Sequence, residues 1–473
     1  MLRIRGAILK LENEPAATVY LLSFNYGRFL ADAIESVRSQ IFPDWELIIL
    51  DGGSTDNTPA VLDRFRDDPR IRILANEGPQ GFRGSANRCI RESRGKYVLR
   101  LDADDLLHPL CLDTYWREAT RSPDVGLFFS DYYYIDEAGE ILGVEAFRDG
   151  ERAVTFPPHG SGSFVRRDTF DRIGFYDETL DAEVSWAAGH GQELWLKMRQ
   201  AGLPAQHIPL PLFLYRQHGP SVSSNAGRLI RAQGAIKRRL ARDLADKETI
   251  VAVIPVRNTH ADMPDLPFMT LDGTTLLERA VGAAQETQSV SQTVVTTDSS
   301  DIAEFMAAHF PDVQTYLRPP ALRAATTPIR SVLQDVVSNA GLSDEAVLCI
   351  LSVNSPRRTS FHVQKAIDNF LLYDVDSVVA VHEERNPIYQ MGSVGLRAVN
   401  PTFHNSHLRR EREAVYIDFG AIRVFRAGNL GESAFMGRRI GHSLMPREDN
   451  IQIESPADFY LLDGSVMEVD PQR

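Results

Sequence analysis

The sequence predicts an α/β protein built from two Rossmann-like domains. Short apolar runs alternate with stretches of helical periodicity over residues 18–110, and the same alternation begins again near residue 250. A chain of 473 residues is long enough for two or three domains. Alternating strands and helices form a mostly parallel sheet covered by helices, and ligands bind such sheets beyond the carboxyl ends of the strands.

In the first half, the apolar runs and the helical spacing place the elements as follows. The expected strands are Val19–Leu22, Glu46–Leu50, Ile71–Leu74 and Tyr97–Leu101. The expected helices are Phe29–Gln40, Pro59–Arg66 and Ser85–Ser93. The polar loops after three of these strands, SFN, DGGSTD and DADD, should therefore meet at one edge of the sheet.

A stretch rich in Arg, Lys and Ala, residues 226–248, predicts an exposed helix that links the two halves. We therefore expect one domain at residues 1–225 and a second at residues 249–473. The expected strands of the second are Val251–Pro255, Gln292–Thr296, Val347–Val353 and Ser377–Val381. Its expected helices are Thr275–Ala284 and Asp301–His309.

Composition excludes several classes of protein. The formal net charge of -13 argues against broad nucleic-acid binding and against electrostatic attraction to anionic lipid. The three cysteines, Cys89, Cys111 and Cys349, are widely spaced and fit a reducing compartment. No segment approaches the roughly 20 apolar residues that span a bilayer. We expect a cytoplasmic protein, with peripheral contact at the inner face of the membrane left open.

The run Val98–Asp105, VLRLDADD, carries the strongest chemical signal. An apolar strand is followed at once by Asp102, Asp104 and Asp105. Carboxylates this close together repel one another, and a hard divalent cation such as Mg²⁺ or Mn²⁺ relieves that repulsion. An isolated Asp-x-Asp is more often a solvated acidic turn, so the flanking motifs decide between the two interpretations.

A second signal follows the second expected strand, Glu46–Leu50. Asp51 is followed by Gly52, Gly53, Ser54, Thr55 and Asp56. A simple strand–turn–helix junction explains the glycines, which allow a tight turn, and the side chains that cap the next helix. It gives Asp51 no role, whereas a carboxylate at this place could accept the N3–H group of a uracil ring.

The segments SFNYGRFLADAIESVRSQ, LIILDGGSTDNT and GKYVLRLDADD together resemble family-two glycosyltransferases with the GT-A fold, over roughly residues 18–222. The resemblance implies inverting transfer of a sugar from a nucleoside diphosphate donor, a UDP-sugar, with Mn²⁺ or Mg²⁺ as cofactor. The nucleotide-binding residues that it implies are Ser23, Phe24, Asn25, Asp51, Arg83 and Asp102. The implied metal ligands are Asp104, Asp102 and His218, although His218 is equally well explained as a surface loop histidine.

The catalytic base is less clear from the sequence. The family carries a Glu-Asp motif before a helix that matches residues 193–202 here, but His190 and Gly191 occupy the positions of the two acids. The first candidate is Glu193 and the second is His190, with Asp181 and Glu183 nearby. Glu193 is explained as well by the helix macrodipole, which favours a carboxylate in the first turn of a helix.

The second half resembles cytidylyltransferases that activate sialic-acid-like sugars with CTP, over roughly residues 250–463. VAVIPVRN, VVTTDSSDIAEF and CILSVNSPRRTS follow that family's order. The phosphate loop keeps Arg257 but has no Gly or Lys from Val256 to Phe268, and Asp262 and Asp265 would repel a triphosphate. Gln452 and Glu454 replace the metal-binding Asp-x-Asp. We therefore expect CTP activation to be lost.

Three functions remain open from these patterns. The first is an inverting, metal-dependent glycosyltransferase acting on a bacterial surface glycan or a lipid-linked acceptor, with an inactive second domain that serves in dimerisation or positioning, or binds a sugar or nucleotide without turnover. The second is a bifunctional enzyme that both activates and transfers a sugar. The third is a non-catalytic scaffold. The intact DADD and DGGSTD motifs favour the first two, and the altered phosphate loop favours the first and third. We expect a homodimer formed through the second domain, and no nucleic-acid partner.

Overall fold

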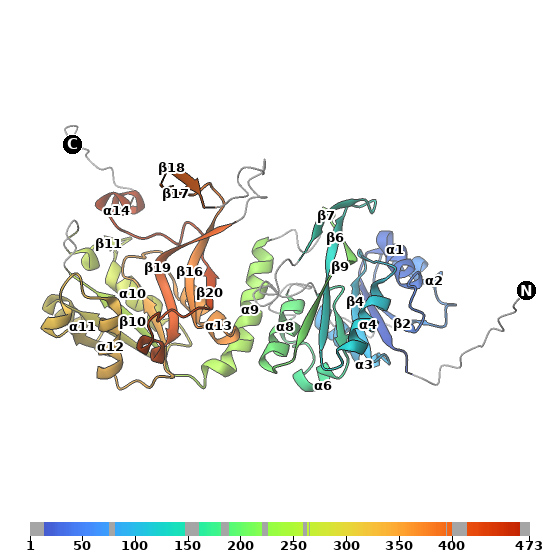
Figure 1. Ribbon diagram of the computed structural model, residues 1–473, viewed down its shortest axis with the longest axis horizontal. Helices are drawn as coiled ribbons and strands as arrows, with labels where there is room; N and C mark the ends of the chain where they lie inside the picture. Colours follow the sequence, from blue (N-terminus) through green and yellow to red (C-terminus); the bar gives the residue numbers. More distant parts are fainter. Residues whose placement is uncertain are drawn as a thin grey trace, which may run out of the picture. The chain divides into compact units, whose positions relative to one another are not determined.

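The structure is a computed structural model. It describes residues 14–74, 81–146, 160–180, 189–219, 226–258, 263, 265–393, 395–399 and 414–463, with the backbone alone at residues 226–233. Contacts divide the chain into two compact units, Met1–Lys237 and Arg238–Arg473. Both units are α/β, as the sequence predicts (Figure 1). The division falls within helix α9 (Ala226–Ala245), which fills most of the stretch predicted to be a helical linker.

The first unit is built on a sheet in the order β3-β2-β1-β4-β8-β6-β9-β5, with β7 paired to β6. Its strands are β1 (Ala17–Ser23), β2 (Trp45–Asp51), β3 (Ile71–Leu74), β4 (Tyr97–Asp102), β5 (Leu106–Leu107), β6 (Leu127–Ile135), β7 (Ile141–Glu145), β8 (Phe164–Arg166) and β9 (Ala205–Arg216). Its helices before α9 include α1 (Gly27–Arg38), α2 (Thr58–Asp63), α3 (Gly81–Glu92), α4 (Cys111–Arg121), α6 (Thr169–Ile173) and α8 (His190–Gln200).

Alternating side chains of β1 divide the core of the first unit between two faces of the sheet. Val19 and Leu21 pack with residues of α1, α2 and α4, whereas Tyr20 packs with residues of α3, α6 and α8. This is the period of two that a strand imposes on its side chains. Because β1 is buried on both faces, most of its residues are apolar, which explains the continuous apolar run in the sequence.

Strand register brings the predicted site residues to one edge of this sheet. β1 pairs in parallel with both β2 and β4. Ser23 stands opposite Asp51, and Leu22 stands opposite Asp102. We call the edge formed by the ends of these three strands the carboxyl rim.

The second unit has a sheet in the order β14-β13-β10-β15-β19-β16-β20, with two small two-stranded sheets, β11-β12 and β17-β18. Its strands are β10 (Ile250–Val256), β11 (Thr270–Leu271), β12 (Thr274–Thr275), β13 (Gln292–Thr297), β14 (Gln314–Leu317), β15 (Val347–Leu351), β16 (Ser377–Glu384), β17 (Tyr389–Gly392), β18 (Gly395–Ala398), β19 (Val415–Arg426) and β20 (Ile440–Leu444). Its helices include α10 (Leu276–Gln285), α11 (Ser300–His309), α12 (Ile329–Asn339), α13 (Ser360–Leu372) and α14 (Pro456–Asp463).

Helices cover both faces of the second sheet as well. Ile250, Ala252 and Ile254 of β10 pack with residues of α10, α11 and α13, whereas Val251 and Val253 pack with residues of α12. In the part of the chain that the structure describes, no helix is both long and apolar enough to cross a membrane.

Candidate functional site

The loops that follow β1 and β2 are tied to each other at the carboxyl rim. The Gly52 backbone N–H donates to the Ser23 carbonyl at 2.7 Å, and the Asn25 N–H donates to Ser54 Oγ at 2.7 Å. Thr55 N–H in turn donates to Asn25 Oδ1 at 2.8 Å. Asn25 has a φ of 60°, a left-handed conformation that asparagine adopts more readily than most residues. The predicted residues Ser23 and Asn25 therefore shape the loop through backbone and amide contacts.

Asp51 ends β2, Phe24 follows β1, and the Phe24 ring lies close to Gly52, the residue after Asp51. Ser54 donates its N–H to Asp51 Oδ2 at 3.1 Å and its hydroxyl to Asp51 Oδ1 at 2.5 Å, so the half-buried carboxylate has a fixed orientation. The Phe24 ring is 39% exposed. A Cβ added at Gly52 would lie 3.4 Å from this ring, so the glycine leaves room beside it. An exposed ring next to an oriented carboxylate suits a planar, hydrogen-bonding ligand.

Two of the predicted metal ligands meet in space although 114 positions separate them in sequence. Asp104 Oδ2 lies 2.9 Å from Nε2 of His218, which follows β9. The rings of Phe29 and Tyr26 lie 5.2 Å and 6.0 Å from the His218 ring and hold it in place. His218 is thus a buried partner of the acidic turn, not a loop histidine turned to solvent.

The third predicted ligand, Asp102, has a different partner. Arg100 Nη2 donates to Asp102 Oδ2 at 2.9 Å, and Arg100 Nε lies 2.9 Å from Asp102 Oδ1. The Arg100 side chain is buried, and its guanidinium lies 5.3 Å from the centre of the Phe82 ring. This two-point contact orients the Asp102 carboxylate at the end of β4.

Arg216 anchors the acidic turn and was not among the predicted residues. Its backbone N–H donates to Asp105 Oδ1 at 3.0 Å, and its Nε donates to the Asp104 carbonyl at 2.9 Å. Its Nη1 also donates to the Glu137 carbonyl at 2.7 Å. Burial, followed by the charges of Asp104 and Asp102, raises the pKa of Asp105 well above its ordinary value. Asp105 is therefore an internal support of the turn.

Tyr26 is a second residue that sequence reasoning missed. Its pKa is raised to about 12, first by burial and then by the charges of Asp104, Asp102 and Asp105. The phenol is accordingly neutral near pH 7 and close to all three carboxylates. A cavity of about 450 Å³ borders this side of the site, and Tyr26, Phe29 and His218 are among its lining residues.

Glu193, the first candidate base, lies in a buried ion pair. Its Oε2 is 3.0 Å from Nε of Arg83, and both side chains are 0% exposed. Its Oε1 accepts the Asp177 backbone N–H at 2.7 Å and lies 2.9 Å from Lys197 Nζ. Both carboxylate oxygens are thus engaged, and Arg83 is turned inward toward α8. The Arg83–Glu193 ion pair thus connects α3 with α8.

His190, the second candidate, is the first residue of α8 and is also buried. Its ring lies 4.4 Å from the Phe82 ring. A Cβ added at Gly160 would lie 2.9 Å from His190 Nε2 and 3.1 Å from Arg100 Nη1, so these two nitrogens border the same small space. His190 therefore lies beside the arginine that holds Asp102. Asp181 and Glu183 fall outside the described residues.

The donor set at the carboxyl rim fits a cation that is shared with a phosphate ligand. Among the described residues, no group of three or more His, Cys, Asp or Glu side chains forms a ready metal cage. Asp104 and His218 nevertheless present an oxygen and a nitrogen 2.9 Å apart. Mg²⁺ is commonly held by one or two carboxylates together with water and substrate phosphates. The carboxylate suits Mg²⁺ or Mn²⁺, and the imidazole adds a nitrogen ligand of the kind that transition metals bind.

The second unit has a cavity of about 300 Å³ at the carboxyl ends of β10 and β15. Its lining includes Arg257 and Arg318 and no carboxylate among the described residues. Arg257 donates to the carbonyls of Ala324 and Ala325, and burial lowers the pKa of Arg318 to about 10. Asp262 lies outside the described residues.

The remaining residues singled out in the second unit are Asp265, Gln452 and Glu454. Asp265 is exposed and precedes a short 3-10 helix. Glu454 is exposed as well, and its backbone N–H donates to Asp458, whereas Gln452 is half-buried. Position 452 therefore offers no carboxylate beside Glu454.

Comparison with known proteins gives a family match for part of the first unit. Residues 18–174 match the family model "Glycosyl transferase family 2". Two curated relatives are "Uncharacterized glycosyltransferase MJ1057" of Methanocaldococcus jannaschii, 32% identical over 28% of this chain and 46% of its own length, and "Chondroitin synthase" of Escherichia coli, 32% identical over 30% of this chain and 20% of its own length. The N-terminal part of the chain is therefore similar to family 2 glycosyltransferases over residues 18–174.

Other proteins are less identical to this chain in sequence or are matched over a smaller share of their own length. "O-antigen biosynthesis protein RfbC" of Myxococcus xanthus is 28% identical over 46% of this chain and 17% of its own length. The crystal structure of S. aureus TarS 1-349 with UDP-GlcNAc has a TM-score of 0.41 at 15% identity, over 49% of this chain and 66% of TarS. The chain thus spans less than half the length of these three curated relatives.

Proposed function

We propose that the first unit is an inverting glycosyltransferase that moves a sugar from a UDP-sugar to a bacterial surface glycan or a lipid-linked acceptor. The observation that carries the proposal is the Asp104–His218 pair, 2.9 Å apart at the rim where Asp51 and Asp102 also end their strands. The family match over residues 18–174 supports the reaction class. The O-antigen and chondroitin relatives support a glycan product.

The loops after β1 and β2 would bind the nucleoside. Phe24 packs its exposed ring on the base, and Asp51, oriented by Ser54, accepts the N3–H of uracil. Ser23 and Asn25 hold the loop that carries Phe24. Asp102, fixed by Arg100, accepts a hydroxyl of the ribose.

Asp104 and His218 would hold Mn²⁺ or Mg²⁺, with Asp102 beside them. When bound, the cation neutralises negative charge on the departing diphosphate. Arg216 keeps the Asp104 carbonyl and the Asp105 carboxylate in place, so that the Asp104 side chain faces His218. Tyr26 stays neutral and is available as a hydrogen-bond donor to a phosphate oxygen.

We assign the general base to His190, because both oxygens of Glu193 are occupied by other donors. An imidazole can take the proton of an acceptor hydroxyl near neutral pH. Glu193 and Arg83 then act through position, by fixing α8 against α3. Direct roles for Arg83 at the phosphates and for Glu193 as the base stay predictions from the sequence that this geometry does not favour.

The test is release of UDP from a panel of UDP-sugars by the full chain with Mn²⁺. We expect Asp104→Ala to reduce release at least 100-fold while the far-UV circular dichroism stays unchanged. Asp124→Ala, at an exposed position on the same unit, is the matched control and should release UDP like the parent chain. Full release by Asp104→Ala with any donor would contradict the proposal.

For the second unit we propose that CTP is not turned over. The cavity between β10 and β15 offers two arginines and, among its described lining residues, no carboxylate that could hold a catalytic cation. Incubation of the full chain with CTP, Mg²⁺ and nine-carbon acidic sugars should give no pyrophosphate above background. Clear pyrophosphate release would instead establish the bifunctional enzyme.

A further inference from the structure

A second cavity of the first unit, of about 350 Å³, lies at the opposite edge of the same sheet. Its lining includes Ala16, Asp44 and Lys96, which directly precede β1, β2 and β4. We call this edge the amino rim. Strand β1 separates the two rims by about 20 Å, given the rise per residue of a strand. The cavity is therefore distinct from the site proposed for the sugar nucleotide.

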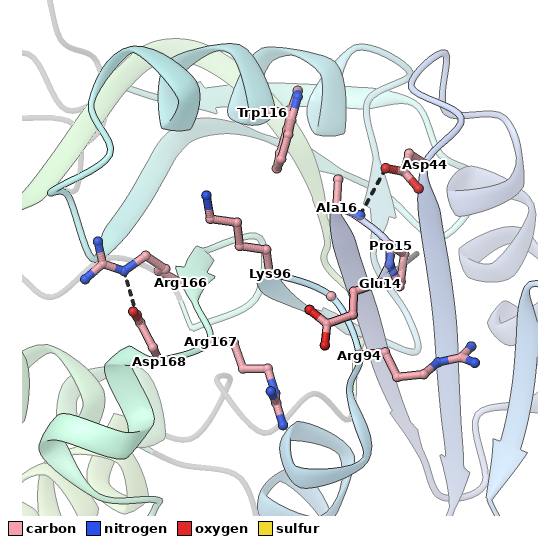
Figure 2. Close-up of a pocket in the computed structure, with 11 residues that line it drawn as sticks. Glu14, Pro15, Ala16, Asp44, Arg94, Lys96, Trp116, Arg166, Arg167 and Asp168 are labelled. Carbon is pink, nitrogen blue, oxygen red and sulfur yellow. Dashed lines mark hydrogen bonds and ion pairs between the residues drawn. The ribbon is translucent and has the colours of Figure 1, made fainter. Parts of the chain in front are cut away.

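The lining combines an aromatic ring with groups that donate and groups that accept hydrogen bonds. Trp116 points into the cavity from α4, above Lys96 and Glu14 (Figure 2). The charged lining residues are the cations Arg94, Lys96, Arg166 and Arg167 and the carboxylates Glu14, Asp44 and Asp168.

Several of these charges already have partners. Arg166 Nε lies 2.5 Å from Asp168 Oδ1, and Arg94 Nε donates to Glu46 at 2.8 Å. No ion pair or side-chain hydrogen bond joins Lys96 or Arg167 to any other residue that the structure describes. Two donors thus remain for a ligand.

Two acceptors, Glu14 and Asp44, line the cavity as well. Asp44 accepts the Ala16 backbone N–H through Oδ2 at 3.2 Å and keeps further lone pairs. The lining has four cations and three carboxylates, and the buried Glu46, which pairs with Arg94, supplies a fourth carboxylate.

The backbone that carries these donors is rigid. Buried Glu46 accepts the Arg94 N–H at 2.7 Å, and the buried Thr18 hydroxyl accepts the Gly95 N–H at 2.8 Å. A Cβ at Gly95 would lie only 2.4 Å from Thr18 N, so no larger residue fits there. A backbone held in place before the ligand arrives loses little conformational entropy on binding.

The balance of donors and acceptors identifies the class of ligand. Lys and Arg side chains only donate hydrogen bonds, and ionised Glu and Asp only accept them. A phosphate would meet Lys96 and Arg167 but would lie beside Glu14 and Asp44. Hydroxyl groups both donate and accept, so a sugar ring satisfies both kinds of side chain, and its apolar face can pack on an indole.

We propose that the cavity at the amino rim is a non-catalytic binding subsite for a glycan. The inference rests on the proposed function, because the glycan that the first unit extends is the natural occupant. A chain held at a second subsite stays close to the catalytic rim, which raises its effective concentration there. Loss of the subsite should weaken binding of long acceptors and leave donor chemistry intact.

The experiment is saturation-transfer NMR on the full chain, without any sugar nucleotide. The probes are maltohexaose, chitotetraose and a chondroitin hexasaccharide. We expect saturation of ring protons of at least one probe, with affinity reduced at least tenfold in Lys96→Ala/Arg167→Ala. Both side chains are exposed, so this variant should fold. Arg66→Ala/Arg172→Ala, at exposed positions of the same unit that are not among the lining residues, is the matched control and should bind like the parent chain.

Trp116 needs a gentler substitution, since its ring also packs against Phe42 and Tyr97 at 5.7 Å and 6.2 Å. Trp116→Phe keeps an aromatic ring and should weaken binding less than the double variant. Absence of saturation for all three probes, or undiminished binding by Lys96→Ala/Arg167→Ala, overturns the inference. UDP release by the same variant reports on the proposed function alone, because water can accept the sugar. Normal UDP release without glycan binding would therefore contradict the proposed subsite and leave the proposed transferase function standing.

Discussion

At the residue scale, Glu193 shows how a carboxylate next to a predicted active site can serve the fold. Its carboxylate is 0% exposed and pairs with Arg83, which is 0% exposed as well. Removing one partner of a buried ion pair leaves the other charged, buried and uncompensated. Substitution of Glu193 should therefore lower the free energy of unfolding more than it lowers the rate of sugar transfer.

We expect Glu193→Gln to lower the free energy of unfolding by about 3 kcal/mol or more. Urea denaturation followed by circular dichroism measures the change. Glu178→Gln, whose side chain is half exposed, is the control and should cost little. A Glu193→Gln protein with parental stability and no transfer would return Glu193 to the role of base.

His190→Ala should have the opposite profile. A general base contributes about 10²- to 10⁴-fold to a rate, so UDP-sugar turnover in the presence of acceptor should fall by that order. Binding of UDP with Mn²⁺ should stay within a few-fold of the parent value, because His190 lies beside Arg100 and not at the Asp104–His218 pair. UDP affinity at equilibrium and the initial rate of turnover should be measured on the same preparations of His190→Ala and the parent. Unchanged turnover in His190→Ala would show that His190 is not the base.

The sequence indicated part of this site, because Asp51, Asp102 and Asp104 directly follow strands that the apolar pattern locates. It could not indicate Arg216 or Tyr26 in the same way. Arg216 acts on Asp105 across 111 positions, and Tyr26 matters because folding packs its ring against His218. Such roles depend on tertiary proximity, which no local pattern contains.

At the element scale, the carboxylate of Glu46 ties β2 to the loop before β4. It accepts from Arg94 N–H, from Arg94 Nε and from the Thr18 hydroxyl, at 2.7 Å, 2.8 Å and 2.8 Å. Burial alone would raise the pKa of Glu46, but these hydrogen bonds outweigh burial and lower it below 4.5. The tie holds the amino rim in the same way that Arg216 holds the carboxyl rim.

This tie predicts a pH dependence of stability. Because the pKa of Glu46 is lower in the folded chain, its contribution is complete above pH 4.5 and is lost as the pH falls through the folded pKa. Glu46→Gln should therefore be less stable than the parent at pH 7, and the difference should shrink as the pH falls below 4.5. Denaturant melts of both proteins at each pH measure it, and a difference that grows on acidification would contradict the assignment.

Elements differed in how well the sequence located them. The buried parallel strands appeared as continuous apolar runs, and β1, β2, β3 and β4 lie within a residue or two of the predicted ranges. Helix α3 begins at Gly81, before the predicted Ser85, because its first turn carries few apolar side chains. Strands β5 and β8 have only two and three residues, too few to show any period.

At the scale of the whole molecule, the second unit exposes an apolar hairpin. Among the residues that the structure describes, strands β17 and β18 pair only with each other, and Met391 and Leu396 are 75% and 66% exposed. An isolated two-stranded hairpin is barely stable in water unless something covers it. The homodimer predicted from the sequence would supply that cover.

We expect the full chain to be dimeric by light scattering coupled to size exclusion, and Met391→Asp/Leu396→Asp to be monomeric. Leu142→Asp, at an exposed apolar position in the first unit, is the control and should leave the dimer intact. A parent chain that is monomeric at all concentrations would remove dimerisation from the account, without touching the transferase.

The account as a whole depends on a nucleotide site that is completed by a cation at Asp104 and His218. Calorimetric titration of the full chain with UDP, with and without Mn²⁺, tests this most directly. We predict that Mn²⁺ tightens UDP binding at least tenfold, and that Asp104→Asn and His218→Gln each abolish the gain while keeping the parental unfolding transition. Equal UDP affinity with and without Mn²⁺, or a full Mn²⁺ effect in both variants, would contradict it.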